Sequence, residues 1–240
     1  MDWFFADTVG DKFTIMGEDA VHITKSLRMS VGEVITVCDS KRTEHLCMIE
    51  RISPDGVEVR VVSESECLNE PSVELTLFAA LTKGDKLETV IQKSVELGVS
   101  RIVPVLTDRC VSRPDGKSAD KKQQRYQKIA AQAAMQSRRA VIPEVSAVTD
   151  LKTAAAALGD YDKVILFYEG GGKPLRELIA ESDRKIAVFT GPEGGYEERE
   201  VEMLTKSGAE CATLGKRILR AETAPLAAIS AIMFHTGNLE

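Results

Sequence analysis

Hydrophobic and polar residues alternate along four short stretches in the first seventy residues of the chain. These stretches, each of which predicts a half-buried β-strand, are residues 12–16, 33–38, 46–52 and 57–62. A Ser-Pro-Asp-Gly turn signal at 53–56 separates the last two, and one helical stretch at 19–29 interrupts the series. Strands this short and closely spaced predict a small β-barrel-like domain, which the polar segment 65–72 is expected to link to the rest of the chain.

From Val73 onward, apolar runs alternate with segments of helical periodicity. The predicted strands are residues 73–81, 101–106, 163–168, 185–190 and 211–214. The predicted helices are residues 85–97, 120–138, 151–158, 174–180, 197–207 and 224–235. Alternation at this spacing predicts a parallel sheet that helices cover on both faces. The fold class is therefore α/β, and we expect a first domain at 1–70 and a second at 71–240.

The charged residues are unevenly distributed along the chain. It holds 31 Lys and Arg against 37 Asp and Glu, a formal net charge of −6 that by itself argues against a nucleic-acid partner. Residues 109–139, however, contain nine basic residues and only two acidic ones. A local excess of this size is typical of a phosphate-binding surface, although a solvated loop and helix face would explain it equally well.

Other features of the sequence indicate where in the cell the protein is expected and whether it binds a metal. The longest nearly apolar stretch, 225–234, is too short to span a bilayer, and the N-terminal residues lack the pattern of a secretory signal. Five cysteines without a Cys-x-x-Cys pair and three separate histidines indicate neither a disulfide framework nor a zinc site. We therefore expect a soluble, cytoplasmic protein with no membrane segment and no metal.

Three loops follow three of the predicted strands and contain glycine. They are residues 169–172, 191–195 and 215–222. Ligands bind at the carboxyl ends of the strands in open parallel sheets, and glycine there lets the backbone approach a ligand closely. None of the loops has the Gly-x-Gly-x-x-Gly fingerprint or the Lys-Ser/Thr of a P-loop. Each loop alone could be a plain turn, but three at equivalent strand ends predict a shared site.

The third loop is charged and precedes an apolar helix. It carries Lys216, Arg217, Arg220 and Glu222 just before a segment in which we expect Thr223 to be the N-cap. The following helix is apolar on nearly every face, so it must be buried or lie in an oligomer interface. A charged loop held against such a helix is a rigid way to place functional groups.

Two motifs of the chain are specific: Gly-Pro-Glu-Gly-Gly at 191–195 and Leu-Gly-Lys-Arg-Ile-Leu-Arg-Ala-Glu-Thr-Ala at 214–224. They closely resemble motifs of the ribosomal RNA small subunit methyltransferase E family, which belongs to the SPOUT methyltransferases. Further similar stretches are residues 22–28, 86–98 and 136–143. One departure is Glu197, where the family pattern leads us to expect Ser or Thr.

The resemblance implies a fold and an activity. The fold would be a PUA-like or OB-like β-barrel followed by a SPOUT α/β domain with a C-terminal trefoil knot, in a homodimer. The activity would be transfer of a methyl group from S-adenosylmethionine to N3 of a uridine, with 16S ribosomal RNA or the small ribosomal subunit as partner. The cofactor-binding residues that the resemblance implies are Leu166, Phe167, Tyr168, Glu169, Gly170, Thr190, Gly191, Pro192, Glu193, Gly194, Gly195, Leu214, Gly215, Ile218, Leu219, Arg220, Thr223 and Ala224.

Uridine N3 carries a proton at neutral pH, so methylation requires a base or cations that stabilise negative charge on the base oxygens. We hypothesise that Arg220 stabilises this charge and that Glu222 orients Arg220 or accepts the proton. An ion pair of Glu222 with Arg217 or Arg220 would explain the carboxylate equally well.

The residues expected to contact RNA are basic side chains of both domains, because Arg and Lys suit phosphate. They are His22, Lys25, Arg28, Arg109, Arg113, Lys121, Lys122, Arg125, Arg138 and Arg139. For His22, a core or capping role explains the residue at least as well. Two other functions remain open: a non-catalytic RNA-binding or ribosome-assembly protein on the same fold, and a nicotinamide-dependent enzyme, against which the missing fingerprint argues.

Overall fold

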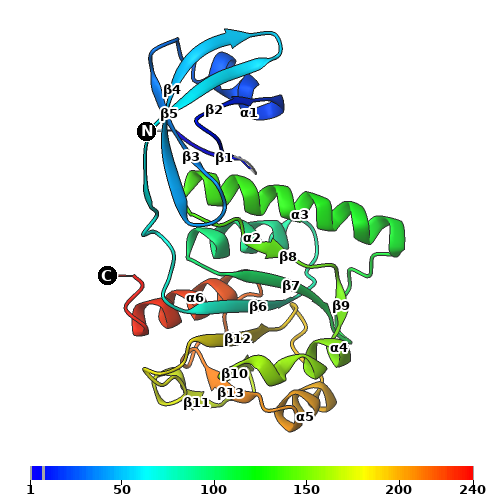
Figure 1. Cartoon of the computed structure of the whole chain (residues 1–240). Helices are drawn as coiled ribbons and strands as arrows, with labels where there is room; N and C mark the ends of the chain where they lie inside the picture. Colours follow the sequence, from blue (N-terminus) through cyan, green and yellow to red (C-terminus); the bar gives the residue numbers. More distant parts are fainter. Residues whose placement is uncertain (1, 7–8, 240) are drawn as a thin grey trace. The chain divides into compact units, whose positions relative to one another are not determined.

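The computed structural model describes residues 2–6 and 9–239, which divide into two compact units (Figure 1). The first unit consists of residues 1–70 together with 134–142, and the second of residues 71–133 together with 143–240. The segment 134–142 therefore completes the first unit, a return of the chain that the sequence pattern did not indicate.

The first unit is built on a five-stranded sheet. In sheet order its strands are β1 (Trp3–Phe5), β3 (Val34–Cys38), β4 (Thr43–Ser53), β5 (Gly56–Glu66) and β2 (Lys12–Ile15). β1 pairs with β3 in parallel, and all other neighbours are antiparallel. Gly56 ends the tight turn between β4 and β5 at a φ of 144°, and a Cβ there would collide with the carbonyl oxygen of Ile15. The turn signal therefore marks a position that requires glycine.

The core of this unit comes from alternate positions of the strands, as the period-two pattern predicts. Ile35, Val37, Ile49 and Val57 are completely buried there. The helical stretch expected at 19–29 is shorter in the structure: α1 (Gly17–Val21) continues into one π-helical turn, η1 (His22–Ser26). The helix cannot extend to residue 29, because Arg28 has a φ of 55°, in the left-handed region.

The segment 134–142 closes one side of the first unit. Ala140 is completely buried in a cluster with Trp3, Cys38 and Cys67. The thiol of Cys38 donates to the carbonyl oxygen of Ala140 at 3.1 Å. Residues that are a hundred positions apart in the sequence thus form one hydrophobic cluster.

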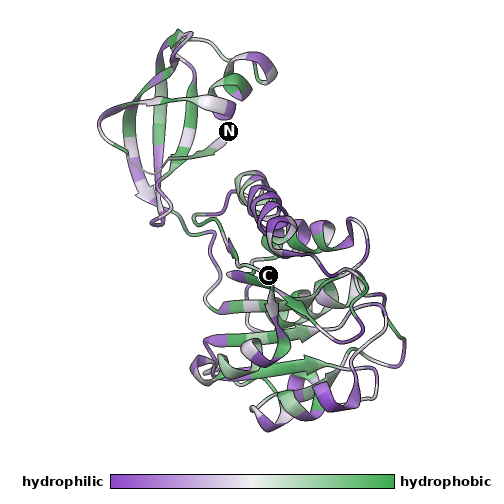
Figure 2. Ribbon diagram, turned by 90° about the vertical axis from the view of Figure 1, so that its right-hand side faces the viewer, coloured by the Kyte–Doolittle hydropathy of each residue, from purple (hydrophilic) through white to green (hydrophobic). Residues whose placement is uncertain are grey.

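The second unit is built on an eight-stranded sheet in which all paired strands are parallel. In sheet order the strands are β11 (Lys173–Pro174), β13 (Glu210–Thr213), β10 (Lys163–Phe167), β12 (Lys185–Thr190), β6 (Glu74–Ala80), β7 (Arg101–Leu106) and β8 (Glu144–Val145), and β9 (Thr149–Asp150) also pairs with β7. The longer strands β6, β7, β10 and β12 are hydrophobic along most of their length (Figure 2), as expected for a sheet that is buried on both faces.

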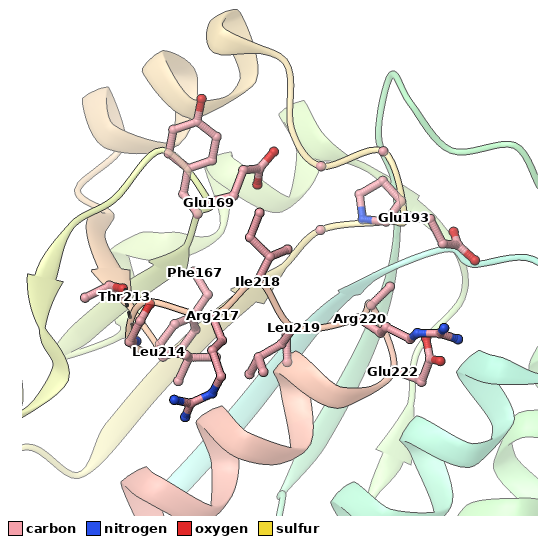
Figure 3. Close-up of a pocket in the computed structure, with 18 of the residues that line it drawn as sticks. Phe167, Glu169, Glu193, Thr213, Leu214, Arg217, Ile218, Leu219, Arg220 and Glu222 are labelled. Atoms are coloured by element: carbon pink, nitrogen blue, oxygen red, sulfur yellow. Dashed lines mark hydrogen bonds between the residues drawn. The ribbon is translucent and has the colours of Figure 1, made fainter.

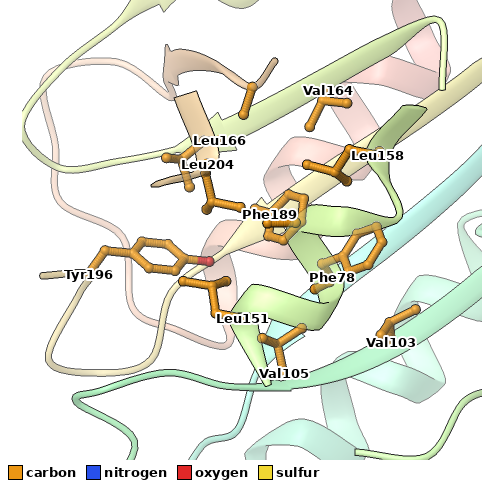
Figure 4. Packing of buried hydrophobic residues seen from close by; sticks show 14 residues of the cluster. Phe78, Val103, Val105, Leu151, Leu158, Val164, Leu166, Phe189, Tyr196 and Leu204 are labelled. Atoms are coloured by element: carbon orange, nitrogen blue, oxygen red, sulfur yellow. The ribbon is translucent and has the colours of Figure 1, made fainter. Parts of the chain in front are cut away.

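Helices cover both faces of this sheet (Figure 1). They are α2 (Lys86–Glu96), α3 (Gly116–Gln136), α4 (Leu151–Ala156), α5 (Glu198–Lys206) and α6 (Thr223–His235). On one face, α4 and α5 pack against a cluster in which the rings of Phe78 and Phe189 stack with centroids 4.4 Å apart (Figure 4). α6 contacts both α2 and β12.

The prediction of a helix at 174–180 is wrong. Residues 173 and 174 instead pair with β13 as the edge strand β11, and only a 3-10 turn, η3 (Leu175–Glu177), follows. Pro174 has an extended ψ of 134°. Proline is tolerated in an edge strand because it need not donate a hydrogen bond there.

No helix in the described part of the chain combines the length and the apolar character that a bilayer span requires.

Candidate functional site

The ends of three neighbouring parallel strands define the site. β10 lies between β12 and β13, so the loops that follow Phe167, Thr190 and Thr213 leave the same edge of the sheet. They enclose a cavity of about 600 Å³, a volume typical of small-molecule sites. Figure 3 shows the side chains of these loops around it. The lining residues are Lys86, Phe167, Tyr168, Glu169, Gly191, Pro192, Glu193, Gly194, Gly195, Ala212, Thr213, Leu214, Gly215, Lys216, Arg217, Ile218, Leu219, Arg220, Ala221, Glu222 and Ala224.

The loop after β12 needs glycine because other side chains pack directly against its backbone. Gly195 has a φ of 70°, donates to the carbonyl of Pro192 at 3.0 Å, and would collide with the Glu169 carboxylate if it carried a Cβ. A Cβ on Gly194 would lie 3.1 Å from Cβ of Arg109. The two glycines thus allow the backbone of this loop to pack directly against the side chains of Glu169 and Arg109.

Arg109 braces the same loop from the end of β7. Its guanidinium donates to the Gly194 carbonyl at 2.7 Å and to the Glu197 carboxylate at 2.9 Å. The hydrogen bond from Arg109 lowers the pKa of Glu197. Arg109 therefore supports the cavity wall, while its side chain stays 43% exposed and its expected contact with RNA remains a prediction.

The side chain of Glu200, in addition to that of Glu197, caps the first turn of α5. The buried Glu200 carboxylate accepts from the Glu197 amide at 2.9 Å and from the Asp108 amide at 2.8 Å. The departure from the family pattern at Glu197 therefore leaves the helix start intact, because Glu200 accepts from the backbone N–H groups on both sides.

The loop after β13 leaves main-chain groups free at the cavity. In the part of the chain that the structure describes, the amides of residues 216–222 donate no hydrogen bond. Gly215 turns the chain at a φ of 95°, and the side chain of Ile218 is 88% exposed over the cavity. Unpaired backbone donors beside apolar side chains suit the edge of a heterocyclic base.

The start of α6 differs from the expected one. Glu222, not Thr223, occupies the N-cap position, and the carbonyl of Arg220 accepts from the amides of Thr223 and Ala224 at 2.9 Å each. The side chain of Arg220 is exposed at the cavity and forms no ion pair within the described residues.

The ionic partner of Glu222 is Lys86, so the expected pairing with Arg217 or Arg220 is wrong. The Lys86 ammonium lies 3.6 Å from Oε2 of Glu222 and 2.9 Å from Oε1 of Glu193. Hydrogen bonding to Glu193 raises the pKa of Lys86. For Glu193, burial raises the pKa, but the hydrogen bond and charge of Lys86 together with backbone hydrogen bonds outweigh burial, and the net pKa is lowered.

Sequence reasoning missed Lys86 as a site residue. It is the first residue of α2, the helix that follows β6, and β6 lies next to β12 in the sheet. That adjacency brings Lys86 to the edge where the three loops meet. The available signal was the position of Lys86 at the start of the recognised motif at 86–98.

Most of the expected cofactor residues line the cavity, but four do not. Leu166 and Thr190 are buried within the strands, Leu166 in the cluster under α4 and α5. Gly170 and Thr223 lie outside the lining set. The lining residues that were not expected are Lys86, Ala212, Thr213, Lys216, Arg217 and Ala221.

The expected RNA-contacting residues fall into two groups by exposure. Exposed residues are His22, Lys25, Arg28, Arg109, Arg113, Lys121, Arg125 and Arg138, and Lys122 is half-buried. Arg125 pairs with Glu88 at 2.6 Å. Arg139 is only 4% exposed and pairs with Glu70 at 2.5 Å, so its burial removes it from the RNA-contacting set.

The described residues contain no group of three or more His, Cys, Asp or Glu side chains with the geometry of a metal site.

Two family models place the chain among the RNA methyltransferases. Residues 69–233 match the family model of an RNA methyltransferase domain. Residues 15–62 match the model of an RNA methyltransferase PUA domain.

Individual relatives narrow this class further. A ribosomal RNA small subunit methyltransferase E from Bacillus subtilis is 37% identical over 232 residues, which cover 93% of this chain and 90% of the relative. One from Mycobacterium bovis is 27% identical over 238 residues, covering 95% and 90%. The crystal structure of a ribosomal RNA small subunit methyltransferase E from Neisseria gonorrhoeae, bound to S-adenosyl methionine, matches with a TM-score of 0.89, 32% identity and 97% coverage of both chains. The chain belongs to the ribosomal RNA small subunit methyltransferase E family.

Proposed function

We propose that this protein transfers a methyl group from S-adenosylmethionine to N3 of a uridine in 16S ribosomal RNA, in the cytoplasm where ribosomes mature. The observation that carries the proposal is the cavity at the ends of β10, β12 and β13, in a chain of this family. The family membership also argues against the nicotinamide-dependent alternative.

The cavity suits an adenosyl group in size and chemistry. The free amides of residues 216–222 would bind the adenine and ribose, beside the apolar side chains of Phe167, Leu214 and Leu219. When bound, the cofactor supplies a methyl group that its sulfonium charge has already activated.

The chain's own residues then have two tasks. Glu222 accepts the proton of uridine N3, and the unpaired guanidinium of Arg220 stabilises the negative charge that develops on the base oxygens. Both groups line the same cavity, which supports these roles.

The proposal includes a division of labour between the domains. Residues 1–70 supply a PUA-like RNA-binding domain, on which His22, Lys25 and Arg28 are exposed. Residues 71–240, apart from the segment 134–142 that completes the first unit, supply the SPOUT methyltransferase domain. RNA would contact this domain through Arg113, Lys121, Lys122 and Arg125.

Two features of the SPOUT fold complete the proposal: a trefoil knot and a homodimer. The path of the chain supports a knot, because it passes from β12 over β10 to β13 and then returns to place α6 against β12 and α2. The apolar character of α6 supports a dimer. One side buries Ile229, Ile232 and Met233, while Phe234 on another side is 67% exposed.

The test is labelled methyl transfer to naked 16S RNA and to small ribosomal subunits, followed by nucleoside analysis. We expect 3-methyluridine to form with at least one of the two substrates. We expect Arg220→Ala to lower the rate about 100- to 1,000-fold and Glu222→Gln about 100- to 10,000-fold. Full rates in both variants would contradict the assigned roles.

Matched controls are Arg176→Ala and Glu198→Gln, which change exposed residues outside the cavity lining and should retain the wild-type rate. If calorimetry detects RNA binding but no binding of S-adenosylmethionine, the protein is instead a non-catalytic RNA-binding protein.

A further inference from the structure

Lys86 connects carboxylates from two different loops of the cavity. Its ammonium lies 2.9 Å from Oε1 of Glu193 in the loop after β12, and 3.6 Å from Oε2 of Glu222 at the start of α6. The backbone amide of Lys83 also donates to Oε1 of Glu193 at 3.2 Å. The start of α2 thereby ties the two loops to each other through one cation.

The Glu222 carboxylate has one oxygen turned inward and the other available. Oε2 is buried and accepts no hydrogen bond from the described residues, so the nearby Lys86 charge compensates it. The Glu222 side chain as a whole is nevertheless 27% exposed. That exposed area must belong to its other atoms, which leaves Oε1 as the oxygen that can meet a ligand in the cavity.

We infer that Lys86 is a positioning residue for methyl transfer: it anchors Oε2 of Glu222 and thereby presents Oε1 to the N3 proton of the target uridine. The inference rests on the proposed function, whose proton acceptor is Glu222. In the step concerned, the N3–H bond breaks, an O–H bond forms on Oε1, and the electron pair of the N–H bond stays on N3. Lys86 keeps its own proton and contributes charge and position.

Geometry favours this role over a purely structural one. The side chains of Lys86, Glu193 and Glu222 are 36%, 30% and 27% exposed, so water screens their mutual attraction and limits its effect on stability. A change in the orientation of a catalytic carboxylate, by contrast, can lower a rate about 100-fold with little effect on folding.

The test compares Lys86→Met, Lys86→Arg and the control Lys93→Met. Lys93 lies on the same helix but pairs with Glu96, away from the cavity. We expect Lys86→Met to lower kcat about 100-fold. Its KM for RNA and its calorimetric Kd for S-adenosylhomocysteine should stay within about threefold of wild type, because neither ligand loses a direct contact. The kcat of Lys86→Arg should be at least about a tenth of the wild-type value. The kcat of Lys93→Met should match that of wild type.

A double variant asks whether Lys86 acts through Glu222. Adding Lys86→Met to Glu222→Gln should lower kcat by no more than about threefold beyond Glu222→Gln alone, because residues that act as a unit are not additive. Hydrogen–deuterium exchange of residues 213–224 provides a readout without turnover, and exchange should be faster in Lys86→Met than in Lys93→Met. If Lys86→Met does not fold, Lys86→Gln takes its place with the same expectations.

The outcomes separate this inference from the proposed function. Wild-type protein that forms no 3-methyluridine on either substrate contradicts the proposed function. Active wild type with an unchanged kcat in Lys86→Met overturns the inference, as do multiplicative effects in the double variant. A Kd for S-adenosylhomocysteine weakened tenfold or more would also overturn it, because Lys86 would then belong to the cofactor site.

Discussion

The buried pair of Glu70 and Arg139 shows how a single residue's surroundings can reverse its expected role. The Glu70 carboxylate accepts from the Arg139 guanidinium and from the amides of Ala140 and Val141 at 2.8 and 3.1 Å. Burial raises the pKa of Glu70, but these bonds outweigh it and hold the pKa below its ordinary value. Glu70 therefore fixes the returning segment 134–142 in the first unit.

We expect Glu70→Gln to destabilise the first unit by about 3–5 kcal/mol at pH 7, because the buried Arg139 guanidinium loses the carboxylate charge of Glu70. The folded pKa of Glu70 lies below the unfolded value, so its stabilising effect is complete above about pH 4.3 and disappears as the pH falls through the folded value. The difference between Glu70→Gln and wild type should therefore shrink below about pH 4.

Urea unfolding followed by fluorescence measures this effect, because the only tryptophan, Trp3, lies in the Ala140 cluster of this unit. The exposed Glu66→Gln is the control. Equal urea midpoints for Glu70→Gln and wild type at pH 7 would show that the pair does not fasten the segment.

The sequence could not distinguish Arg139 from its neighbour. Arg138 and Arg139 are chemically identical, and both lie in the basic stretch, yet Arg138 is exposed and Arg139 is buried. The difference arises from Glu70, which is 69 positions away, and no local pattern reports that contact. The same limit explains why Lys86, rather than a nearby arginine, is the partner of Glu222.

At the scale of elements, strands and helices with strong periodicity were predictable and two-residue strands were not. The strand predicted at 185–190 has the same bounds in β12, and the predicted helix at 85–97 differs from α2 by one residue at each end. β8, β9 and β11 contain two residues each, too few to show any period. Their positions depend on pairing with strands from elsewhere in the chain.

Glu200 of α5 accepts a hydrogen bond from the amide of Asp108, in the loop after β7, and this contact between the two elements provides a prediction at this scale. Glu200→Ala should lower the stability of the second unit by about 2–3 kcal/mol, because the amides of Asp108 and Glu197 lose the buried Glu200 carboxylate, the acceptor that they have among the described residues. Cofactor affinity should fall as well, since Arg109 and Glu197 then brace the glycine loop less firmly.

Chemical denaturation and calorimetry with S-adenosylhomocysteine measure the two effects of Glu200→Ala. Glu202→Ala on the same helix is the control, because Glu202 is exposed. A Glu200→Ala protein as stable as this control would rule out the bridging role.

At the scale of the whole molecule, the acidic net charge conceals a basic surface. The net charge is −6, yet the helix α3 and the loop before it carry exposed Arg113, Lys121 and Arg125. The sequence located this stretch, but it could not show which cations are already paired. Arg125 is paired with Glu88, whereas Lys121 has no ion pair among the described residues.

We expect RNA affinity to fall steeply with salt, because phosphate contacts release bound counterions. Lys121→Ala should reduce the slope of log affinity against log salt by about one and weaken binding similarly for all RNA sequences. Filter binding across a salt titration measures both. Lys152→Ala, on the exposed side of α4, should leave the slope unchanged. A wild-type affinity that does not depend on salt would exclude the basic surface as the RNA contact.

Long-range topology set the remaining limit on prediction. The alternation of strands and helices indicated an α/β fold, but it gives no information on sheet order or on how the chain passes between strands. The crossing from β12 to β13 and the packing of α6 against α2 depend on contacts between distant segments. The expected cofactor residues were largely found at the cavity because the recognised motifs lie in the loops themselves.

The return of residues 134–142 to the first unit has a consequence for biosynthesis. A nascent chain that has emerged only to residue 70 lacks Ala140, which fills the space among Trp3, Cys38 and Cys67. The amino-terminal unit therefore cannot reach its final packing until more than half of the polypeptide has left the ribosome. Until then, its unfinished hydrophobic side remains open to solvent or to a chaperone.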